Sequence, residues 1–356
     1  MIRRIQLSLN ASNTGKLTQL DSVMTESLRV LNCYIDVLWA TKSTNKFAAI
    51  KINTWLTARL QQCLLKQASE VVKSQNKKMH KTQPVVSKRT INLDERFLTF
   101  SEDVNSFDFW IKIASLGDNI IVNIPARKHK HFNSYRNNGW SMRRGGRLRQ
   151  NNKGWFLDVY MEKDAPPIKI SGAVVGLDIG YKKLIADSNG TIHDVGLMGV
   201  YEKIVRKKQG SKSFGRALIE RDQKINQTVN KMDLAQVKTI IAEDLKSVKS
   251  ASRGRIRKDF NNKLQRWSYP KVLGKLQSVC EVNGIAFKKV DPAYTSQTCS
   301  ACGSVDKASR KCEKFCCTKC GMTMDADINA AKNILMRGVY SPPSEQCNEI
   351  PFSLQL

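Results

Sequence analysis

Apolar and polar residues alternate at the start of the chain and then change to a longer period. Residues 3–12, RRIQLSLNAS, alternate one by one, which predicts a β-strand. Residues 17–75 repeat apolar positions at helical spacing, with Ser, Thr and Asn as breaks, and predict three or four helices. Residues 75–89 are polar and basic with one proline, as expected of a connector.

Short alternating runs return between residues 90 and 163. They include FLTFSE, FDFWIKIAS, NIIVNIPA and GWFLDVYME, which predict an antiparallel barrel or sheet. The helical stretch therefore interrupts a β domain after its first strand. We predict a β-barrel formed by residues 1–14 and 88–166, with residues 15–87 as an inserted helical bundle.

After the Pro-Pro linker at residues 166–167, the pattern becomes that of a mixed α/β layer. Residues 173–196 predict two or three strands, and 238–245 and 285–293 one strand each, with helical segments between them and a last helix at 327–337. This order is expected of an RNase H-like layer. The predicted fold class is therefore α/β plus β, with an N-terminal barrel and a C-terminal RNase H-like domain.

Three acidic residues stand at or just beyond apolar runs in this second half. Asp178 ends VVGLD, Glu243 ends TIIAE, and Asp327 begins DINAAKNIL. Carboxylates at the ends of neighbouring strands can share two Mg²⁺ ions, one activating water and the other stabilising the leaving oxygen. Ligands that are all oxygen favour such hard ions over zinc. The three residues predict a metal-dependent nuclease site.

Each of these carboxylates also has a purely structural interpretation. Asp178 could open a turn, Glu243 beside Asp244 could end a surface strand, and Asp325 or Asp327 could cap the last helix. Their order, with apolar strands leading into the first two, favours the metal site. Because Asp325 and Asp327 are two positions apart and point in different directions, we expect one to be a ligand and the other the cap.

Six of the ten cysteines lie between residues 299 and 320. Four of them form two Cys-x2-Cys pairs, each followed by glycine, which is typical of a closed structural zinc site. Cys312 and Cys316 are expected to be spectators, and no His or water-activating Glu is present for a catalytic zinc. We predict a zinc ribbon at residues 295–322 with the ligands Cys299, Cys302, Cys317 and Cys320.

The charge of the chain adds a polyanionic partner to this picture. Lys and Arg number 59 against 31 Asp and Glu, a formal net charge of +28 that is spread along the whole sequence. Such an excess most often neutralises the phosphates of nucleic acid. We expect no signal peptide and no membrane span, and the cysteine distribution suits a reducing, cytoplasmic compartment.

The densest basic segment is 126–150, which has eight Lys/Arg, no acid, and Phe132, Tyr135 and Trp140 interleaved. Positive charge contacts phosphates while flat rings stack on unpaired bases, so the segment predicts binding of RNA or single strands. A solvated hairpin loop is the alternative interpretation. The candidate contacts are Arg127, Lys128, Lys130, Arg136, Trp140, Arg143, Arg144 and Arg147.

Four motifs, GLDIG, IIAEDL, VDPAYTSQTCSACG and CGMTMDADINAAKNI, together resemble the TnpB proteins of bacterial insertion sequences. These are compact RNA-guided DNA endonucleases related to type V CRISPR effectors. The resemblance covers roughly residues 174–337, and before that only the layout agrees. It maps the RuvC-like catalytic triad onto Asp178, Glu243 and Asp327, and so favours Asp327 over Asp325 as the third member.

The resemblance also implies partners and cofactors. A guide RNA encoded by the transposon would direct cleavage of double-stranded DNA beside a short adjacent motif, with Mg²⁺ for catalysis and one structural Zn²⁺. The β domain would be the wedge, residues 170–294 and 323–338 the RuvC-like domain, and 339–356 an irregular tail. Alternatives are an RNA-guided transcriptional repressor and a small type V CRISPR effector. A further basic run fits heteroduplex binding: Arg253, Arg255, Arg257 and Lys258.

Overall fold

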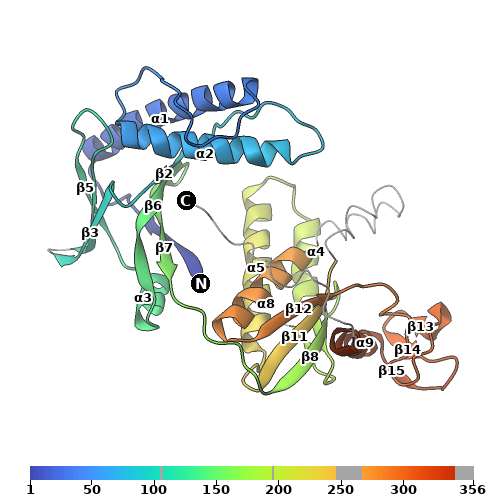
Figure 1. Cartoon of the computed structure of the whole chain (residues 1–356). Helices are drawn as coiled ribbons and strands as arrows, with labels where there is room; N and C mark the ends of the chain where they lie inside the picture. The colour runs from blue at the N-terminus through green and yellow to red at the C-terminus, as the bar shows by residue number, and fades with distance from the viewer. Residues whose placement is uncertain (105–106, 195, 246–266, 341–356) are drawn as a thin grey trace. The chain divides into compact units, whose positions relative to one another are not determined.

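A computed structural model describes residues 1–104, 107–194, 196–245 and 267–340. The chain divides into two compact units, the first being Met1–Asp164 and the second beginning at Ala165. Figure 1 shows the helices and strands of each. Each unit has an apolar cluster of its own, around residues such as Leu31 and Val159 in the first and Leu177 and Ile240 in the second.

The first unit contains two antiparallel sheets. One has the order β1-β7-β6-β2, formed by β1 (Ile2–Ser8), β7 (Gly154–Glu162), β6 (Ser141–Asn151) and β2 (Thr90–Leu93). The other has the order β3-β4-β5, formed by β3 (Leu98–Val104), β4 (Phe107–Ile113) and β5 (Val122–Ala126).

The predicted barrel is not closed within the residues that the structure describes. Among them β2 pairs with β6, and β3 pairs with β4, but no pairing joins β2 to β3. The physical reason is a turn directly after the short β2, in which the Phe97 N–H donates to the Asp94 carbonyl at 3.3 Å. The chain therefore starts a second sheet, and side chains of both sheets fill one core.

The helical insertion has two long helices instead of the predicted three or four. They are α1 (Thr14–Ala40), capped by Asn13, and α2 (Ala58–Asn76), capped by Thr57. The polar residues expected to break α1 are accommodated within it, because Asn32 exchanges hydrogen bonds with the backbone of Val86 at 2.9 and 3.0 Å. That asparagine holds the connector against the helix.

The second unit is built on a five-stranded sheet with the order β10-β9-β8-β11-β12. β8 (Ala173–Asp178), β11 (Val237–Glu243) and β12 (Ala286–Val290) are parallel, β9 (Ile185–Asp187) is antiparallel to β8, and β10 (Ile192–His193) is antiparallel to β9. The predicted strands of this region are confirmed.

Helices cover both faces of this sheet. α4 (Leu197–Val205), α5 (Lys212–Lys231) and α8 (Tyr269–Val282) share a core with Val175 and Leu177 of β8. On the opposite face, α9 (Ala326–Tyr340) packs Ile334 against Ile241 of β11 and Val290 of β12. Successive strand residues point to opposite faces, which explains the two separate clusters.

A small three-stranded sheet precedes α9. It consists of β13 (Arg310–Lys311), β14 (Lys314–Cys316) and β15 (Thr323–Asp325), with a short 3₁₀ turn, η1 (Lys307–Ser309), ahead of it. Because β15 runs directly into α9, this small sheet is joined to the helix that covers one face of the larger sheet.

Candidate metal sites

Asp178 and Glu243 lie side by side at the ends of two parallel strands. Asp178 is the last residue of β8 and Glu243 the last of β11, and the preceding residues, Leu177 and Ala242, are paired in the register. Leu177 and Ala242 face the core that contains α4, α5 and α8. The two acids therefore project from the other face of the sheet.

That other face is covered by α9, and two glycines allow the close approach. A Cβ at Gly176 would lie 2.3 Å from the Ala331 carbonyl oxygen, and one at Gly338 would lie 2.4 Å from the Ile241 side chain. Only glycine permits this contact of the helix with the strands. Asp327, in the first turn of α9, is thereby brought to the strand ends.

The charges of Glu243 and Asp327 act on the carboxyl group of Asp178. Burial first, and then the negative charges of Glu243 and Asp327, raise the pKa of Asp178 to about 8. Burial also raises the pKa of Glu243. Acids gathered in a region of low dielectric repel one another, and a divalent cation would relieve that repulsion. Their oxygen donors fit Mg²⁺.

Two basic side chains of the protein already lie against this acidic group. The guanidinium of Arg310, from β13, is 2.9 Å from Oδ1 of Asp327. The ammonium of Lys183 forms an ion pair with Asp325 and lies 3.8 Å from Asp327. The acidic charge is therefore partly balanced by the chain itself, and a metal ion would compete with these cations.

Asp325 is the cap of α9. Its Oδ1 accepts hydrogen bonds from the N–H groups of Asp327 at 3.0 Å and Ile328 at 3.3 Å. The prediction that one acid of this pair caps the helix is confirmed, and the carboxylate of Asp327 is not used in the cap but pairs with Arg310.

The segment that enters α8 holds the backbone at both strand ends. The Tyr269 hydroxyl donates to the Glu243 carbonyl and accepts from the Leu245 N–H at 3.2 Å. The indole N–H of Trp267 donates to the carbonyl of Gly180 at 3.0 Å, two residues beyond Asp178. These bonds restrain the chain directly after two of the acids.

Sequence reasoning missed Arg310, Lys183, Trp267 and Tyr269. Lys183 had a signal, since it follows Asp178 by five residues, just beyond the GLDIG motif. Arg310 had none, because its contact with Asp327 depends on how the small sheet folds back onto α9.

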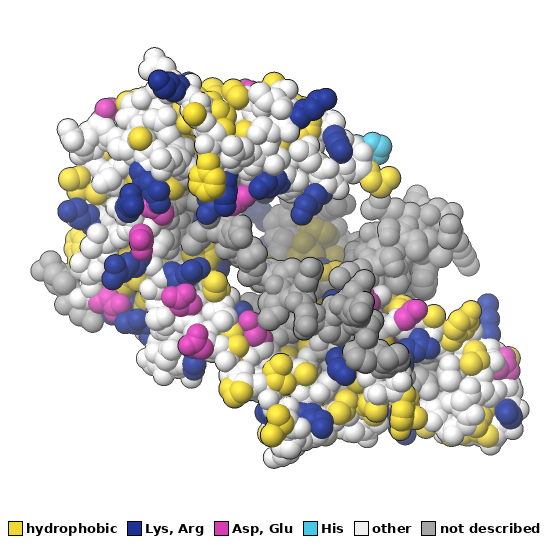
Figure 2. Space-filling model, in the orientation of Figure 1, with side chains coloured by type: hydrophobic (Ala, Val, Ile, Leu, Met, Phe, Trp, Pro, Cys, Tyr) yellow, Lys and Arg dark blue, Asp and Glu magenta, His cyan; other side chains and the backbone are white. Residues whose placement is uncertain are grey.

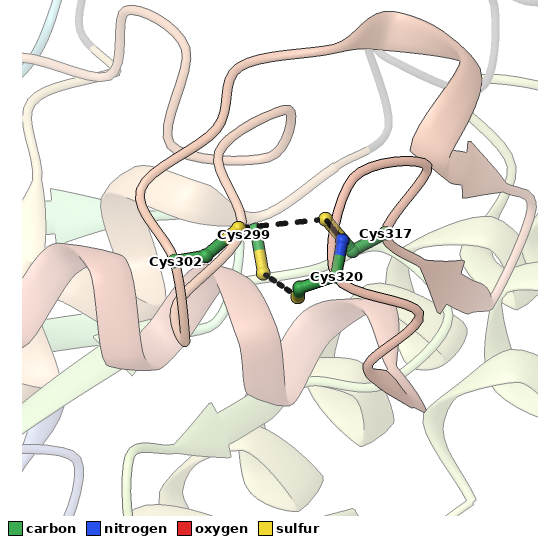
Figure 3. Close-up of side chains that lie close together, drawn as sticks. All are labelled: Cys299, Cys302, Cys317 and Cys320. Atoms are coloured by element: carbon green, nitrogen blue, oxygen red, sulfur yellow. Dashed lines mark hydrogen bonds between the residues drawn. The ribbon is translucent and has the colours of Figure 1, made fainter.

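The four predicted cysteine ligands form one compact cluster. The Sγ atoms of Cys299, Cys302, Cys317 and Cys320 all lie within 4.8 Å of one another. Figure 3 shows the two pairs facing each other from separate loops. Among the described residues this is the only group of three or more His, Cys, Asp or Glu packed so closely, so the carboxylates are less tightly gathered. The cluster can hold a metal ion such as zinc.

Local backbone geometry prepares each cysteine pair. Gly303 and Gly321 follow the pairs with φ angles of 71° and 73°, and their N–H groups donate to the carbonyls of Cys299 and Cys317. The backbone N–H of Cys320 donates to Sγ of Cys317 at 3.4 Å. This bond, followed by bonds from the Lys319 backbone and from neighbouring thiols, lowers the pKa of Cys317 to about 6. Thiolates are the metal-binding form of cysteine.

The aromatic residues of the basic segment 126–150 are placed differently from the prediction. Phe132 is 0% exposed and Trp140 is 7% exposed, and both belong to the core of the first unit, against which Tyr135 packs. The segment forms α3 (Lys130–Asn137) and most of β6, not a hairpin loop. Because its ring is used in packing, Trp140 is not an open stacking surface, and that part of the prediction is corrected.

The basic candidates of this segment fall into two groups. Those bonded to other side chains are Lys128 and Arg136, both with Glu102, Arg143 with Glu162, and Arg147 with Asn92. Those simply exposed are Arg127, Lys130 and Arg144. The second basic run, Arg253, Arg255, Arg257 and Lys258, lies outside the described residues.

Lys and Arg side chains are spread over the visible surface and do not gather in one spot, as Figure 2 shows. This agrees with a charge excess distributed along the whole sequence. Within the described residues, no helix combines the length and the apolar character that a membrane crossing requires.

The chain is similar to known proteins over parts of its length. A family model described as "Cas12f1-like, TNB domain" matches residues 269–334, which include α8, β12, the cysteine cluster and the start of α9. The chain is 42% identical over 77 residues to the CRISPR-associated endodeoxyribonuclease Cas12f1 of Sulfoacidibacillus thermotolerans, a match covering 21% of this chain and 18% of that protein.

Two further relatives connect the chain to insertion-sequence proteins. The InsQ protein of Escherichia coli K12, provisionally named an RNA-guided DNA endonuclease, is 27% identical over 220 residues, which are 52% of this chain and 54% of InsQ. The TnpB-like protein aq_aa05 of Aquifex aeolicus is 33% identical over 97 residues, a match that covers 26% of this chain and 31% of that protein. The matched segments thus span about half or less of these relatives.

The fold agrees with a solved structure. A cryo-EM structure of a Cas12f1-sgRNA-target DNA complex contains a chain that superposes with a TM-score of 0.55 at 18% identity, covering 90% of this chain and 81% of that one. The likeness supports a Cas12-like fold. Residues 269–334 match the Cas12f1-like TNB domain, and the chain is similar over parts of its length to Cas12f1 and TnpB-like proteins, as its motifs indicated.

Proposed function

We propose that this protein is an RNA-guided endonuclease that cleaves double-stranded DNA by metal-assisted phosphodiester hydrolysis. One observation carries the proposal: Asp178, Glu243 and Asp327 come from three separate elements of a mixed sheet and its covering helix, and the charges of Glu243 and Asp327 both act on Asp178. The names of the relatives support the same activity, since Cas12f1 is an endodeoxyribonuclease and InsQ carries the name of an RNA-guided DNA endonuclease.

The strand order supports a RuvC-like nuclease domain. A sheet in which the first three strands form an antiparallel meander and two more strands run parallel to the first is the RNase H-like arrangement, with acids at the ends of the first and fourth strands. We assign residues 170–294 and 323–338 to this domain and 295–322 to the ribbon. Residues 1–14 and 88–166 would be the wedge, and 15–87 the recognition insertion.

Asp178, Glu243 and Asp327 would hold the catalytic Mg²⁺ ions through their carboxylate oxygens. Bound Mg²⁺ neutralises phosphate charge and lowers the pKa of a bound water molecule. For Asp178 to bind, its carboxyl group must lose its proton, which the raised pKa makes harder near neutral pH without a cation. Arg310 and Lys183 balance the acidic charge until then.

The four cysteines would hold one structural Zn²⁺. Four thiolates would fill the coordination of such an ion, so it would stabilise the ribbon and not take part in hydrolysis. Arg310 and Glu313 belong to the ribbon and pair with Asp327 and Lys182, respectively. A folded ribbon therefore supports the edge where the acids lie.

The partners we propose are a guide RNA, encoded by a transposon or a CRISPR array, and target DNA beside a short adjacent motif. Base pairing would read the target while the protein binds the backbone of the duplex. The charge of +28 supplies the attraction for both nucleic acids. In the first unit, Arg127, Lys130 and Arg144 are exposed and are our candidates for phosphate contacts.

Sequencing the RNA that co-purifies with the protein tests this proposal. One abundant structured RNA is expected, and the complex with Mg²⁺ should cut a plasmid library only where targets match that RNA. Random RNA fragments with guide-independent cutting would refute guidance. Specific binding of matched plasmids without cleavage by the wild-type protein would instead identify a repressor.

A further inference from the structure

The loop between β12 and the cysteine cluster, residues 291–298, contacts both Glu243 and α9. We propose that Thr295 is a positioning residue for the Glu243 carboxylate and that Asn333 of α9 holds Thr295 in place. This inference rests on the metal-dependent function proposed above. It assigns a role to two residues that lie within the quoted motifs but to which the motifs themselves gave none.

Thr295 is 3% exposed and its hydroxyl reaches the side chain of Glu243 directly. The Oγ1 of Thr295 donates to Oε1 of Glu243. The carbonyl oxygen of Pro292 also lies 3.1 Å from Oγ1 of Thr295. A hydroxyl has one proton, and an ionised carboxylate is the stronger acceptor, so the proton points to Glu243. The bond selects one rotamer of a side chain that would otherwise sample several.

The position of Thr295 is set by α9. Asn333, 9% exposed, donates through Nδ2 to the carbonyls of Thr295 at 2.9 Å and Thr298 at 2.6 Å. Asn329, fully buried one turn earlier, donates to the Thr298 carbonyl at 2.8 Å and accepts from the Ser300 N–H at 3.0 Å. Both amides therefore bond to the backbone of residues 295–300.

A third side chain of α9 continues the same row. Arg337 donates to the carbonyls of Asp291 at 2.6 Å and Ala293 at 2.7 Å. Positions 329, 333 and 337 are four residues apart and lie on one helix face. The helix that carries Asp327 is therefore bonded along its length to the loop that carries Thr295.

These contacts connect two of the proposed metal ligands through the protein. Asp327 begins α9, Asn333 of the same helix holds Thr295, and Thr295 bonds Glu243. A shift of α9 would move both carboxylates together. Groups that orient a ligand in this way typically change metal affinity by about 10–100-fold when they are lost.

A purely structural role for Thr295 makes a different prediction, and the same loop offers a matched control. The Thr298 hydroxyl donates to the Tyr294 carbonyl at 2.8 Å. Thr298→Val and Thr295→Val each remove one hydroxyl from this loop at constant side-chain volume. Only Thr295→Val removes a bond to a carboxylate.

The test measures Mn²⁺ binding by calorimetry to the zinc-loaded full chain freed of RNA, with melting temperatures in parallel. Thr295→Val should bind Mn²⁺ about 10–100-fold more weakly, Thr295→Ser should restore binding, and Thr298→Val should bind like the wild type. Wild-type affinity in Thr295→Val, or equal weakening in Thr298→Val, would overturn the positioning role. If Thr295→Val does not fold, Thr295→Ala and Thr298→Ala are compared instead.

Glu243→Gln separates this inference from the proposed function. If Glu243→Gln weakens Mn²⁺ binding and Thr295→Val does not, the metal site stands and the role of Thr295 fails. If Glu243→Gln binds Mn²⁺ like the wild type, the proposed metal site itself fails, and the positioning role fails with it.

Discussion

The cysteine cluster and the acidic centre are both metal-site candidates, but they are built in opposite ways. Four thiols from one segment of 22 residues, Cys299 to Cys320, lie within 4.8 Å of one another. The three acids come from positions up to 149 residues apart (178 to 327), are less closely gathered, and lie beside Arg310 and Lys183. A closed local site suits a structural ion, and an open site assembled by the fold suits catalysis.

The largest expected effect is on the cysteine side of this comparison. Cys299→Ser should lose the bound zinc and unfold the ribbon, because structural zinc binding contributes about 10–16 kcal/mol of folding free energy in small zinc domains. Zinc content by atomic spectroscopy and proteolysis of the ribbon measure this. Cys312→Ser, at an exposed cysteine outside the cluster, is the control. Full zinc retention in Cys299→Ser would contradict the assignment of Cys299 to a structural zinc site.

The next effect distinguishes the two acids at the start of α9. Asp327→Asn should weaken Mn²⁺ binding at least about tenfold, because a ligand to the metal should matter no less than a group that merely orients one. Asp325→Asn should change it little, because asparagine caps a helix as well as aspartate. Calorimetric titration of both variants gives the ratio. If Asp325→Asn weakened Mn²⁺ binding more than Asp327→Asn, Asp325 would be the metal ligand and Asp327 would not.

A smaller effect concerns the stability of the metal-free protein. The pKa of Asp178 is about 8 when folded against 3.8 for an unperturbed group, so the folded state binds a proton that the unfolded state releases. Stability therefore falls as pH rises from about 4 to about 8. Asp178→Asn should remove this fall and stabilise the metal-free protein at pH 7 by about 1 kcal/mol or more.

Urea unfolding without added Mg²⁺ or Mn²⁺ across this pH range measures the effect of Asp178→Asn, on zinc-loaded protein checked for retained zinc. Asp306 serves as the opposite case, since the hydrogen bond from the Thr318 hydroxyl lowers its pKa. Asp306→Asn should therefore give no increase in stability. An unchanged pH dependence in Asp178→Asn would mean that burial and the neighbouring acids do not raise the pKa of Asp178 as described.

The smallest expected effect tests the protein's own cations. Arg310→Ala removes a positive charge from Asp327, so Mn²⁺ should bind more tightly by up to about fivefold, corresponding to the ~1 kcal/mol of a partly exposed ion pair. Raising the salt concentration should shrink the difference between variant and wild type. Weaker Mn²⁺ binding in Arg310→Ala would show that the arginine organises the acids instead of competing with metal.

Sequence predicted the cysteine ligands, the sheet of the second unit and the helix cap, because each depends on spacing or periodicity within a short segment. It did not predict that Trp140 turns inward, since a ring among basic residues has the same local pattern whether it faces core or solvent. It also missed the bond from Thr295 to Glu243, which joins residues 52 positions apart. The missing pairing between β2 and β3, which leaves the barrel unclosed, depends on one turn that the alternation of apolar and polar residues does not predict.

Exchanging the guide tests the central claim most directly. The co-purified RNA is replaced by one whose guide segment matches a chosen plasmid, and cleavage is followed in Mg²⁺ for wild type and Asp178→Ala. We expect the wild type to cut the chosen plasmid and not a scrambled one, while Asp178→Ala cuts neither. The cleavage rate should fall about 10³-fold or more, because the metal ions stabilise the transition state by several kcal/mol. Equal cutting of both plasmids, or undiminished cutting by Asp178→Ala, would contradict the account.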